Sequence, residues 1–350
     1  MKRIVLIALA AVILAGAAWF TEPWWESNAK RTERVRRIFV ETLGRDPKGW
    51  DEASLRYWVD SRLRPSQIRR QLESQRPLVG VHYFTWYRRT EGSPWGNGMT
   101  TVLPDSAKPE LGWYNSNDRE VMDAHIAQMA SAGFDFVIVN IIADSPPSWG
   151  NAQKFFDRLA GHRLRAAVMI DGLNVAPAAV KQQWVEKAKT GLAMHPNYFA
   201  LHGQPLIMLY SAPLDFQVDG VALRNVYWTS DYAPAANSFN PDHALHPRDW
   251  PFWSPHAPAV INGVVPVMPG YSDSHLGRAV SMEHPRRDGS LYHEQWQRAL
   301  ALRPELIIVY GWNEYFEQTF IEPTDRFGDR YVKWTACYAA LAHAGQRGTC

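Results

Sequence analysis

The chain has 350 residues, of which 46% are hydrophobic and 21% are charged, and its formal net charge is +2. This length and composition suit one large globular domain with room for a small second one. A charge so close to zero provides no strong single-sign field, which argues against a dedicated nucleic-acid surface.

Residues 1–25 have the pattern of a targeting segment. Lys2 and Arg3 precede an apolar run from Ile4 to Phe20, and Ala15-Gly16-Ala17 offers a cleavage site. This order is typical of a secretory signal peptide. The run is also nearly long enough to span a bilayer, so an uncleaved membrane anchor is the alternative. Both interpretations place the rest of the chain outside the cytoplasm: periplasmic, tethered to the inner membrane facing the periplasm, or secreted.

Residues 30–76 are predicted to form a separate, arginine-rich helical module. Apolar residues recur at helical spacing in two stretches. These are Val35/Ile38/Phe39/Leu43 and Leu55/Trp58/Val59/Leu63, with Gly44 and Pro47 ending the first. The run 43–47 with Trp58-Val59 resembles a short helical module of bacterial exopolysaccharide-linked proteins. We interpret the module as a spacer or cap between membrane and barrel, and a binding role is the alternative.

Residues 77–350 alternate between apolar, strand-like runs and helical stretches, which is the signature of a β/α fold. The seven candidate strands are Val79–Phe84, Phe134–Ile142, Arg165–Ile170, Pro205–Tyr210, Asn225–Thr229, Val260–Met268 and Leu306–Tyr310. An eighth strand is expected in the irregular stretch Phe239–Ala259. The pattern predicts an α/β fold, a (β/α)8 TIM-like barrel that follows the helical module.

The clearest helix begins after Asn117, which forms a capping-box-like start with Glu120. His125 lies on the apolar face of this helix, so we interpret it as a packed core histidine and not as a ligand. Further helices are predicted at Ala152–Ala160, Ala178–Gly191 and Leu291–Leu302.

Aromatic and acidic residues follow the predicted strands, where the active sites of barrel enzymes lie. In strand order they are Tyr83, Trp86 and Tyr87; Asp144; Asp171; Tyr210 and Ser211; Trp228, Ser230 and Asp231; and Tyr271. Aromatic rings stack on sugar faces, and carboxylates accept hydrogen bonds from hydroxyl groups. The ring of side chains therefore indicates a carbohydrate site, although each residue singly could be structural.

The last strand, Leu306–Tyr310, is followed by Glu314 and Glu317, three residues apart. If the chain turns helically after Gly311, these side chains become neighbours at about 5–6 Å. Retaining glycosidases hold their two carboxyl groups at about 5–5.5 Å. The alternative interpretation is a pair of solvated loop acids.

The sequence of residues 312–323, WNEYFEQTFIEP, resembles the signature of glycoside hydrolase family 99 and its relatives, the endo-α-mannosidases and endo-α-mannanases. Shorter pieces resemble the family in the same order, so the resemblance spans roughly Pro77 to Lys333. They are Val79–Tyr87, Leu111–Ser116, Pro269–Asp273, Arg287–Gly289 and Phe327–Tyr331.

The resemblance implies an endo-acting hydrolase that cleaves an α-linked polysaccharide or oligosaccharide with retention and without a protein nucleophile. It implies that Glu314 deprotonates the 2-hydroxyl of the substrate, which displaces the leaving group, and that Glu317 is the general acid and then the base. Substrate-binding roles are expected for the neighbouring Trp312, Asn313 and Glu322, and for Tyr83, Trp86, Tyr87, Asp144, Asp171 and Tyr271 at the strand ends.

Departures from the family leave the sugar open. Phe316 replaces a histidine between the two acids, Gln318-Thr319-Phe320 replaces Gly-Thr-Gln, and Asn140-Ile141-Ile142 replaces Ser-Trp-Trp. A preference for mannan is therefore not carried over. Two alternatives stand beside hydrolysis: a glycosyltransferase-like protein of polysaccharide assembly, and a non-catalytic exopolysaccharide-binding protein.

The sequence contains no nucleotide-binding glycine loop, no serine-hydrolase elbow and no zincin motif, so no cofactor and no metal is expected. Cys337 and Cys350 lie close enough in sequence to pair, and an oxidising compartment would permit this disulfide. Two free thiols are the alternative. The oligomeric state is left open.

We predict that residues 1–25 export the protein. A reporter enzyme fused after Ser27 should be active only outside the cytoplasm, because a signal peptide and a membrane anchor both carry the following segment across the membrane. Paired reporters, one active only in the cytoplasm and one only outside it, measure this, with a fusion lacking residues 1–25 as the control. Activity of the full fusion in the cytoplasm alone would contradict export.

Overall fold

The structure is a computed structural model that describes residues 27–43, 59, 64–74, 76–89, 107–227, 248–252, 260–278 and 281–350. The chain divides into two compact units, Met1–Ser74 and Gln75–Cys350. The targeting segment predicted over residues 1–25 lies outside the described residues. Within the described ranges, no helix has the length and apolar character needed to cross a membrane.

In the first unit, helix α2 (Asn28–Leu43) contacts helix α4 (Pro65–Ser74). Val35 and Ile38 of α2 and Ile68 of α4 are buried. The Arg31 Nε atom donates a hydrogen bond of 2.6 Å to the carbonyl oxygen of Val59. The first predicted helix is therefore present. The second, around Leu55–Leu63, lies outside the described residues except at Val59.

Eight parallel strands form the barrel of the second unit. In spatial order they are β7 (Asp249–Pro251), β6 (Ala222–Tyr227), β5 (Gln204–Tyr210), β3 (Arg165–Asp171), β2 (Phe136–Ile142), β1 (Leu78–Phe84), β11 (Leu306–Val309) and β8 (Val264–Val267). The two end strands β7 and β8 are in contact, although no ladder pairs them in the described part of the chain. The predicted (β/α)8 TIM-like fold is confirmed, and the expected eighth strand is β7.

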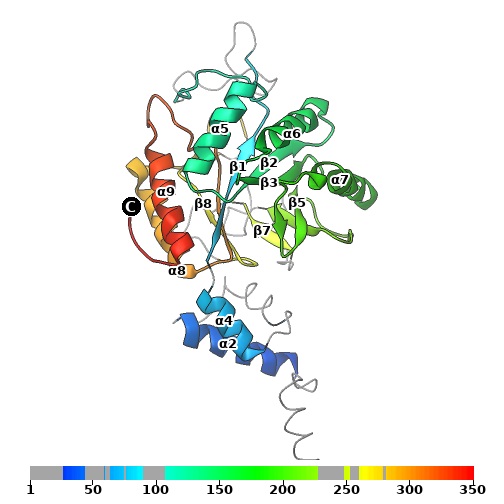
Figure 1. Ribbon diagram of the computed structural model, residues 1–350, viewed down its shortest axis with the longest axis vertical. Helices are drawn as coiled ribbons and strands as arrows, with labels where there is room; N and C mark the ends of the chain where they lie inside the picture. Colours follow the sequence, from blue (N-terminus) through cyan, green and yellow to red (C-terminus); the bar gives the residue numbers. More distant parts are fainter. Residues whose placement is uncertain are drawn as a thin grey trace, which may run out of the picture. The chain divides into compact units, whose positions relative to one another are not determined.

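Five helices flank the strands of this unit among the described residues (Figure 1). They are α5 (Arg119–Ser131), α6 (Pro146–Leu159), α7 (Ala178–Thr190), α8 (Ser290–Leu302) and α9 (Arg330–Ala344). Two predicted helix starts were wrong. The N-cap of α5 is Asp118, without a side-chain capping bond, and α6 begins earlier than expected, with proline in its first turn, where that residue is favoured.

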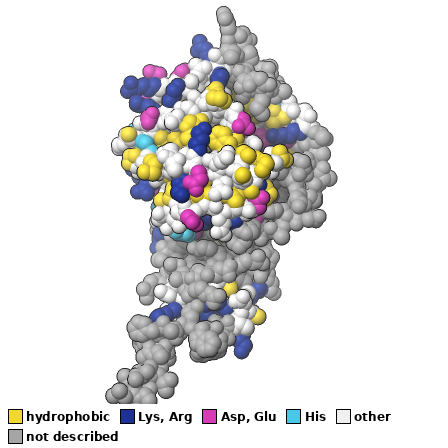
Figure 2. Space-filling model, turned by 90° about the vertical axis from the view of Figure 1, so that its right-hand side faces the viewer, with side chains coloured by type: hydrophobic (Ala, Val, Ile, Leu, Met, Phe, Trp, Pro, Cys, Tyr) yellow, Lys and Arg dark blue, Asp and Glu magenta, His cyan; other side chains and the backbone are white. Residues whose placement is uncertain are grey.

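Short elements complete the unit. They are β4 (Ala200–Leu201), which pairs with β5, the hairpin of β9 (Tyr271–Ser272) and β10 (Glu283–His284), and the 3-10 turns η2 (Leu192–Met194) and η3 (Arg287–Gly289). On the face seen in Figure 2, basic, acidic and apolar side chains are interspersed.

The barrel interior changes from apolar to polar along the strands. Near its amino end, Gly80 lies against the ring of Phe136, and a Cβ atom at this glycine would be 2.4 Å from the Phe136 Cζ atom. Only glycine fits there. Two residues further along β1, His82 is buried against the rings of Phe252 and Tyr310. Polar side chains therefore begin to fill the interior toward the carboxyl ends of the strands.

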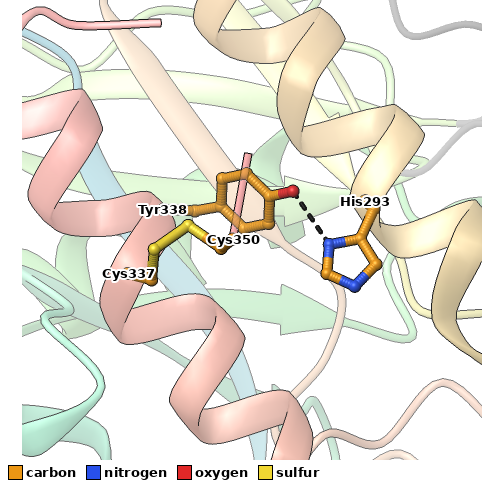
Figure 3. Close-up of a disulfide and its surroundings, with 4 residues drawn as sticks. All are labelled: His293, Cys337, Tyr338 and Cys350. Carbon is orange, nitrogen blue, oxygen red and sulfur yellow. Dashed lines mark hydrogen bonds between the residues drawn. A yellow bond between two sulfur atoms is a disulfide. The ribbon is translucent and has the colours of Figure 1, made fainter. Parts of the chain in front are cut away.

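A disulfide joins Cys337 of α9 to Cys350 at the end of the chain (Figure 3). Beside it, the Tyr338 hydroxyl lies 2.8 Å from the Nδ1 atom of His293, and the Tyr338 ring stacks on Trp296 with 5.3 Å between ring centroids. His293 and Trp296 belong to α8. The disulfide thus closes the tail onto the helix that packs against α8.

Replacing Cys350 by serine should lower the free energy of unfolding by at most about 3 kcal/mol, because the bond closes a short loop of the unfolded chain. The loss will be smaller where the tail frays without the barrel. Chemical denaturation of the wild type and of Cys350→Ser measures it, and non-reducing peptide mapping tests the bond itself. Finding both thiols free in the exported protein would contradict the pairing.

Candidate active site

Residues 310–322 form one compact loop after β11, here named the carboxylate loop. The Gly311 N–H donates to the Thr319 carbonyl oxygen over 3.0 Å, and the Trp312 carbonyl oxygen accepts a bond of 2.9 Å from the Ile321 N–H. Between these contacts the chain turns, with the Gln318 N–H 3.3 Å from the Tyr315 carbonyl oxygen. The change of direction expected after Gly311 is therefore present, and it keeps Glu314 and Glu317 on one turn.

The carboxylate loop is attached to the end of β1. The Asn313 side chain accepts a hydrogen bond from the Phe84 N–H and donates one to its carbonyl oxygen, both at 2.9 Å. The Tyr315 N–H donates to the Tyr87 hydroxyl over 2.9 Å, and the Trp312 N–H donates to the His82 carbonyl oxygen over 2.7 Å. These contacts hold the loop in place over the barrel.

A second buried network supports the loop from behind. Glu322 accepts a hydrogen bond of 2.9 Å from the Tyr114 hydroxyl, and its other oxygen lies 2.8 Å from the Nε2 atom of His125. The Nδ1 atom of His125 in turn lies 3.0 Å from the Tyr83 hydroxyl. His125 is thus buried as predicted, but it has polar partners on both ring nitrogens.

Glu314 is almost completely buried, with 3% of its surface exposed. Its Oε1 atom accepts a hydrogen bond of 2.9 Å from the Phe316 N–H. Burial, followed by the charge of Glu317, raises the pKa of Glu314 well above its ordinary value. A carboxyl group with such a pKa holds its proton toward neutral pH.

Glu317 accepts hydrogen bonds from three side chains. The Tyr310 hydroxyl donates to Oε2 over 2.6 Å, whereas Oε1 lies 2.6 Å from Nη2 of Arg278 and 3.3 Å from the Tyr271 hydroxyl. Arg278 also donates to Asp273 over 3.0 Å. Burial, and then the charges of Glu317 and Glu314, raise the pKa of Tyr310 well above its ordinary value, so its hydroxyl is a proton donor here.

Further polar groups lie at the strand ends. Asp171 is half-buried at the end of β3, and burial, with a smaller contribution from the Glu317 charge, raises its pKa. Burial lowers the pKa of His82 to about 3, so its ring is neutral. His82 Nδ1 and Asn140 Oδ1 are buried and have no hydrogen-bond partner among the described residues. Buried polar atoms of this kind are normally paired, so these two are available to a ligand.

The predicted site residues fall into two groups. In one group, Glu314, Tyr271 and Asp171 each interact with Glu317. Trp86, in the same group, packs on Phe316 with 6.4 Å between ring centroids. The other group consists of Tyr83, Tyr87, Trp312, Asn313 and Glu322, which are all buried and bonded to the loop, to β1 or to α5.

The contacts of this second group position the loop, and its role in substrate binding stays a prediction. Tyr83 packs against His125 of α5 and Phe155 of α6, since successive strand residues point to opposite faces. Asp144 is exposed just beyond β2. Trp228, Ser230 and Asp231 lie outside the described residues.

Sequence reasoning missed Tyr310 and Arg278. Tyr310 follows Leu306 and Ile308 at a spacing of two, which predicts an inward side chain at the end of the strand. Arg278 gave no signal, because its importance depends on contacts with Glu317, which is far away in the sequence. Within the described ranges, no group of three His, Cys, Asp or Glu side chains could hold a metal ion.

Comparisons with solved structures find the same fold in proteins of low sequence identity. The structure of a GH99 endo-α-mannosidase from Bacteroides thetaiotaomicron is 19% identical, with a TM-score of 0.58, and the match covers 76% of this chain and 98% of that one. A second structure, of a GH99 endo-α-mannosidase in complex with Bis-Tris propane, is also 19% identical, with a TM-score of 0.57. The match covers 76% of this chain and 97% of that one.

A glycoside hydrolase-like protein is 12% identical, with a TM-score of 0.51, over 76% of this chain and 94% of that one. No protein-family model and no curated protein matches the sequence. At these identities the likeness shows that the second unit has the fold of GH99 endo-α-mannosidase.

Replacing Glu314 by glutamine should make stability less dependent on pH. The pKa of Glu314 is raised above its ordinary value of 4.5. The protonated Glu314 side chain therefore makes its full contribution to the free energy of unfolding at pH values below its ordinary pKa. That contribution is lost as the pH rises through the raised pKa of the folded protein. Since glutamine cannot ionise, the melting temperature of Glu314→Gln minus that of the wild type should increase with pH above 4.5.

Thermal melts across this pH range measure the difference. Glu110→Gln is the matched control, because Glu110 is exposed, and its curve should run parallel to that of the wild type. A difference for Glu314→Gln that stays constant with pH would contradict the burial of an ionisable Glu314.

Proposed function

We propose that this chain is a glycoside hydrolase that cleaves an α-linked saccharide with retention at Glu314 and Glu317. One observation carries the proposal: two carboxyl groups, electrostatically coupled, lie on a single anchored loop at the carboxyl end of a barrel strand. That end of a (β/α)8 barrel is where catalytic residues lie. The structural neighbours, GH99 endo-α-mannosidases and a glycoside hydrolase-like protein, support the same class of reaction.

In the first proposed step, Glu314 takes the proton of the 2-hydroxyl group. The O2–C1 bond forms as the bond from C1 to the leaving oxygen breaks, and Glu317 gives its proton to that oxygen. A raised pKa suits Glu314 for this task, because a base is most effective when its pKa lies near the working pH. The result is a 1,2-anhydro sugar, without a covalent bond to the protein.

In the second step, water attacks C1 of the anhydro sugar. Glu317 takes a proton from the water while the O2–C1 bond breaks, and Glu314 returns a proton to O2. C1 is inverted twice, so its configuration is retained. Substrate-assisted routes of this kind are known exceptions to the usual scheme with a carboxylate nucleophile.

Arg278 must leave Glu317 before this chemistry. The raised pKa of Glu314 favours a proton on that carboxyl group, whereas the proposed roles need the proton on Glu317. Arg278 lies 2.6 Å from Glu317, and its side chain is 42% exposed, so it can turn outward when a sugar enters. When Arg278 leaves, Glu317 loses the cation that opposes transfer of the proton from Glu314 to Glu317.

The setting of the enzyme is also part of the proposal. The pattern of residues 1–25 and the Cys337–Cys350 bond support export, because disulfides persist in oxidising compartments. The substrate is then an extracellular or periplasmic polysaccharide, cleaved within the chain as the sequence resemblance implies. The helical module would act as a spacer.

Glu314→Gln and Glu317→Gln should each lower turnover by about 10²–10⁴-fold, because each removes one proton-transfer group. An aryl glycoside with a good leaving group should restore much of the rate of Glu317→Gln but not that of Glu314→Gln. With that substrate, the acid limb of the pH profile should lie at lower pH in Glu317→Gln, since one cause of the raised Glu314 pKa is gone.

Initial-rate kinetics of the three proteins measure this, with Glu110→Gln as the control that should keep wild-type rates. A 2-deoxy substrate should be inert because it lacks the nucleophilic hydroxyl group. Ready hydrolysis of the 2-deoxy compound, or a glycosyl ester trapped on either glutamate, would refute the mechanism.

A further inference from the structure

A cavity of about 710 Å³ lies beside the carboxylate loop. Its lining includes Tyr271 and Gln318. The Tyr271 hydroxyl is 3.3 Å from Glu317, and Gln318 follows that glutamate directly in the chain. Neither Glu314 nor Glu317 lines the cavity, which is connected to the proposed catalytic pair through Tyr271 and Gln318 and extends along the β9–β10 hairpin and η3. A neighbouring sugar residue of the substrate would lie there.

Basic side chains outnumber acidic ones in the lining of this cavity. Four arginines contribute to it, Arg286, Arg287, Arg326 and Arg330, against two carboxylates, Glu283 and Asp288. Arg287 is neutralised by a bidentate pair with Glu294, at 3.1 and 2.5 Å, and Arg330 lies 2.9 Å from Asp288. In the part of the chain that the structure describes, Arg286 and Arg326 have no carboxylate partner.

Hydrogen bonds and aromatic contacts hold the Arg286 side chain in place. Its Nη2 atom donates to the carbonyl oxygens of Gln318 and Phe320, at 2.9 and 2.7 Å. Its guanidinium group lies over the rings of Phe320 and Phe327, at 4.5 and 4.8 Å from their centroids. Gly270 leaves room for the stem, since a Cβ atom there would be 2.5 Å from the Arg286 Cγ atom.

The Nη1 atom of Arg286 is buried and has no hydrogen-bond partner among the described residues. A partly buried guanidinium group that lacks a carboxylate partner and has one nitrogen unbonded is costly, so an anion in this cavity would stabilise it. Both ring nitrogens of His275, at the same cavity, are also buried without partners in the described structure. Burial lowers the pKa of His275, so its neutral ring offers one donor and one acceptor to a sugar hydroxyl.

We infer that the substrate is an acidic saccharide, and that Arg286 and Arg326 bind a carboxylate or phosphate group of the sugar next to the bond that is cleaved. The guanidinium group matches both anions, because its N–H groups form paired, charge-assisted hydrogen bonds with oxygen atoms. This inference rests on the proposed function for the position of the cleaved bond. The anion site itself rests on the cavity alone.

The test compares two matched pairs of ligands on Glu314→Gln, whose turnover should be about 10²–10⁴-fold lower, so that binding is measured with little cleavage. One pair is an α-1,4-linked oligogalacturonate and its carboxyl-reduced, neutral form. The other is a phosphorylated α-linked mannan oligosaccharide and its phosphatase-treated form. Calorimetry should show binding about 10-fold or more tighter for the charged member of at least one pair. That preference should weaken as salt is added.

Adding Arg326→Gln, an exposed position, should reduce the preference for the charged ligand by about 10-fold. Arg165→Gln is the matched control, because Arg165 is exposed at the amino end of β3, and it should keep the full preference. Arg286→Lys is the second variant, with circular dichroism to verify folding, and it should also weaken the preference because lysine lacks the planar fork.

Equal affinity for charged and neutral ligands in both pairs, or failure of both charged ligands to bind, would overturn the inference. So would a preference that survives Arg326→Gln. Cleavage of neutral ligands with equal ease would overturn the anion site and leave the proposed hydrolase standing. Tight, Arg326-dependent binding of a charged ligand that the wild type never cleaves would support the anion site and count against the hydrolase.

Discussion

The proposed active site depends on the burial of two neighbouring carboxyl groups, those of Glu314 and Glu317. Removing them from water costs free energy, and their charges repel each other. The protein offsets this cost in different ways. Burial and the Glu317 charge raise the pKa of Glu314, which favours its protonated form, whereas Glu317 accepts bonds from Tyr310, Arg278 and Tyr271. The two carboxyl groups therefore have different environments, and the proposed roles need the proton to move from Glu314 to Glu317 when Arg278 leaves.

This arrangement requires a loop that does not move. Asn313 binds the backbone of β1 with both ends of its amide, and Glu322 joins the loop to His125 of α5. The acidic motif of the sequence thus has two functions. Its first two glutamates lie at the proposed reaction centre, and its third lies behind the loop and fixes it. Among the residues that the structure describes, Arg278 is the exposed partner of the pair, which gives the site a group that can leave when a sugar enters.

The sequence was sufficient for the fold and for identifying the loop that holds Glu314 and Glu317 after the last barrel strand. Continuous apolar runs predicted the barrel strands, and even the irregular stretch before Ala259 contained the expected strand β7. The turn after Gly311 was a condition for bringing the two glutamates together, and the structure contains a turn there. These features depend on local pattern and on the period of strands, which a single sequence contains.

Side-chain roles were harder to predict because they depend on direction and on distant partners. Tyr83 was expected to contact substrate, but its neighbour His82 occupies the inward position on β1. Arg278 meets Glu317 only through the folded hairpin after β8. The paired and unpaired arginines beside that hairpin likewise appear only in three dimensions. The anion site inferred from these arginines changes the question about the substrate, which becomes the identity of an acidic sugar and not of a neutral one.

The most direct test of the central claim is cleavage of defined α-linked oligosaccharides by the purified wild type in ¹⁸O-labelled water. Mass spectrometry follows the label, and rapid NMR follows the anomer that forms first. The account predicts one ¹⁸O atom per cleaved bond, at the new reducing end, with the α-anomer appearing first. A first-formed β-anomer would contradict retention, and an absence of cleavage across both charged and neutral oligosaccharides would contradict the assignment as a glycoside hydrolase.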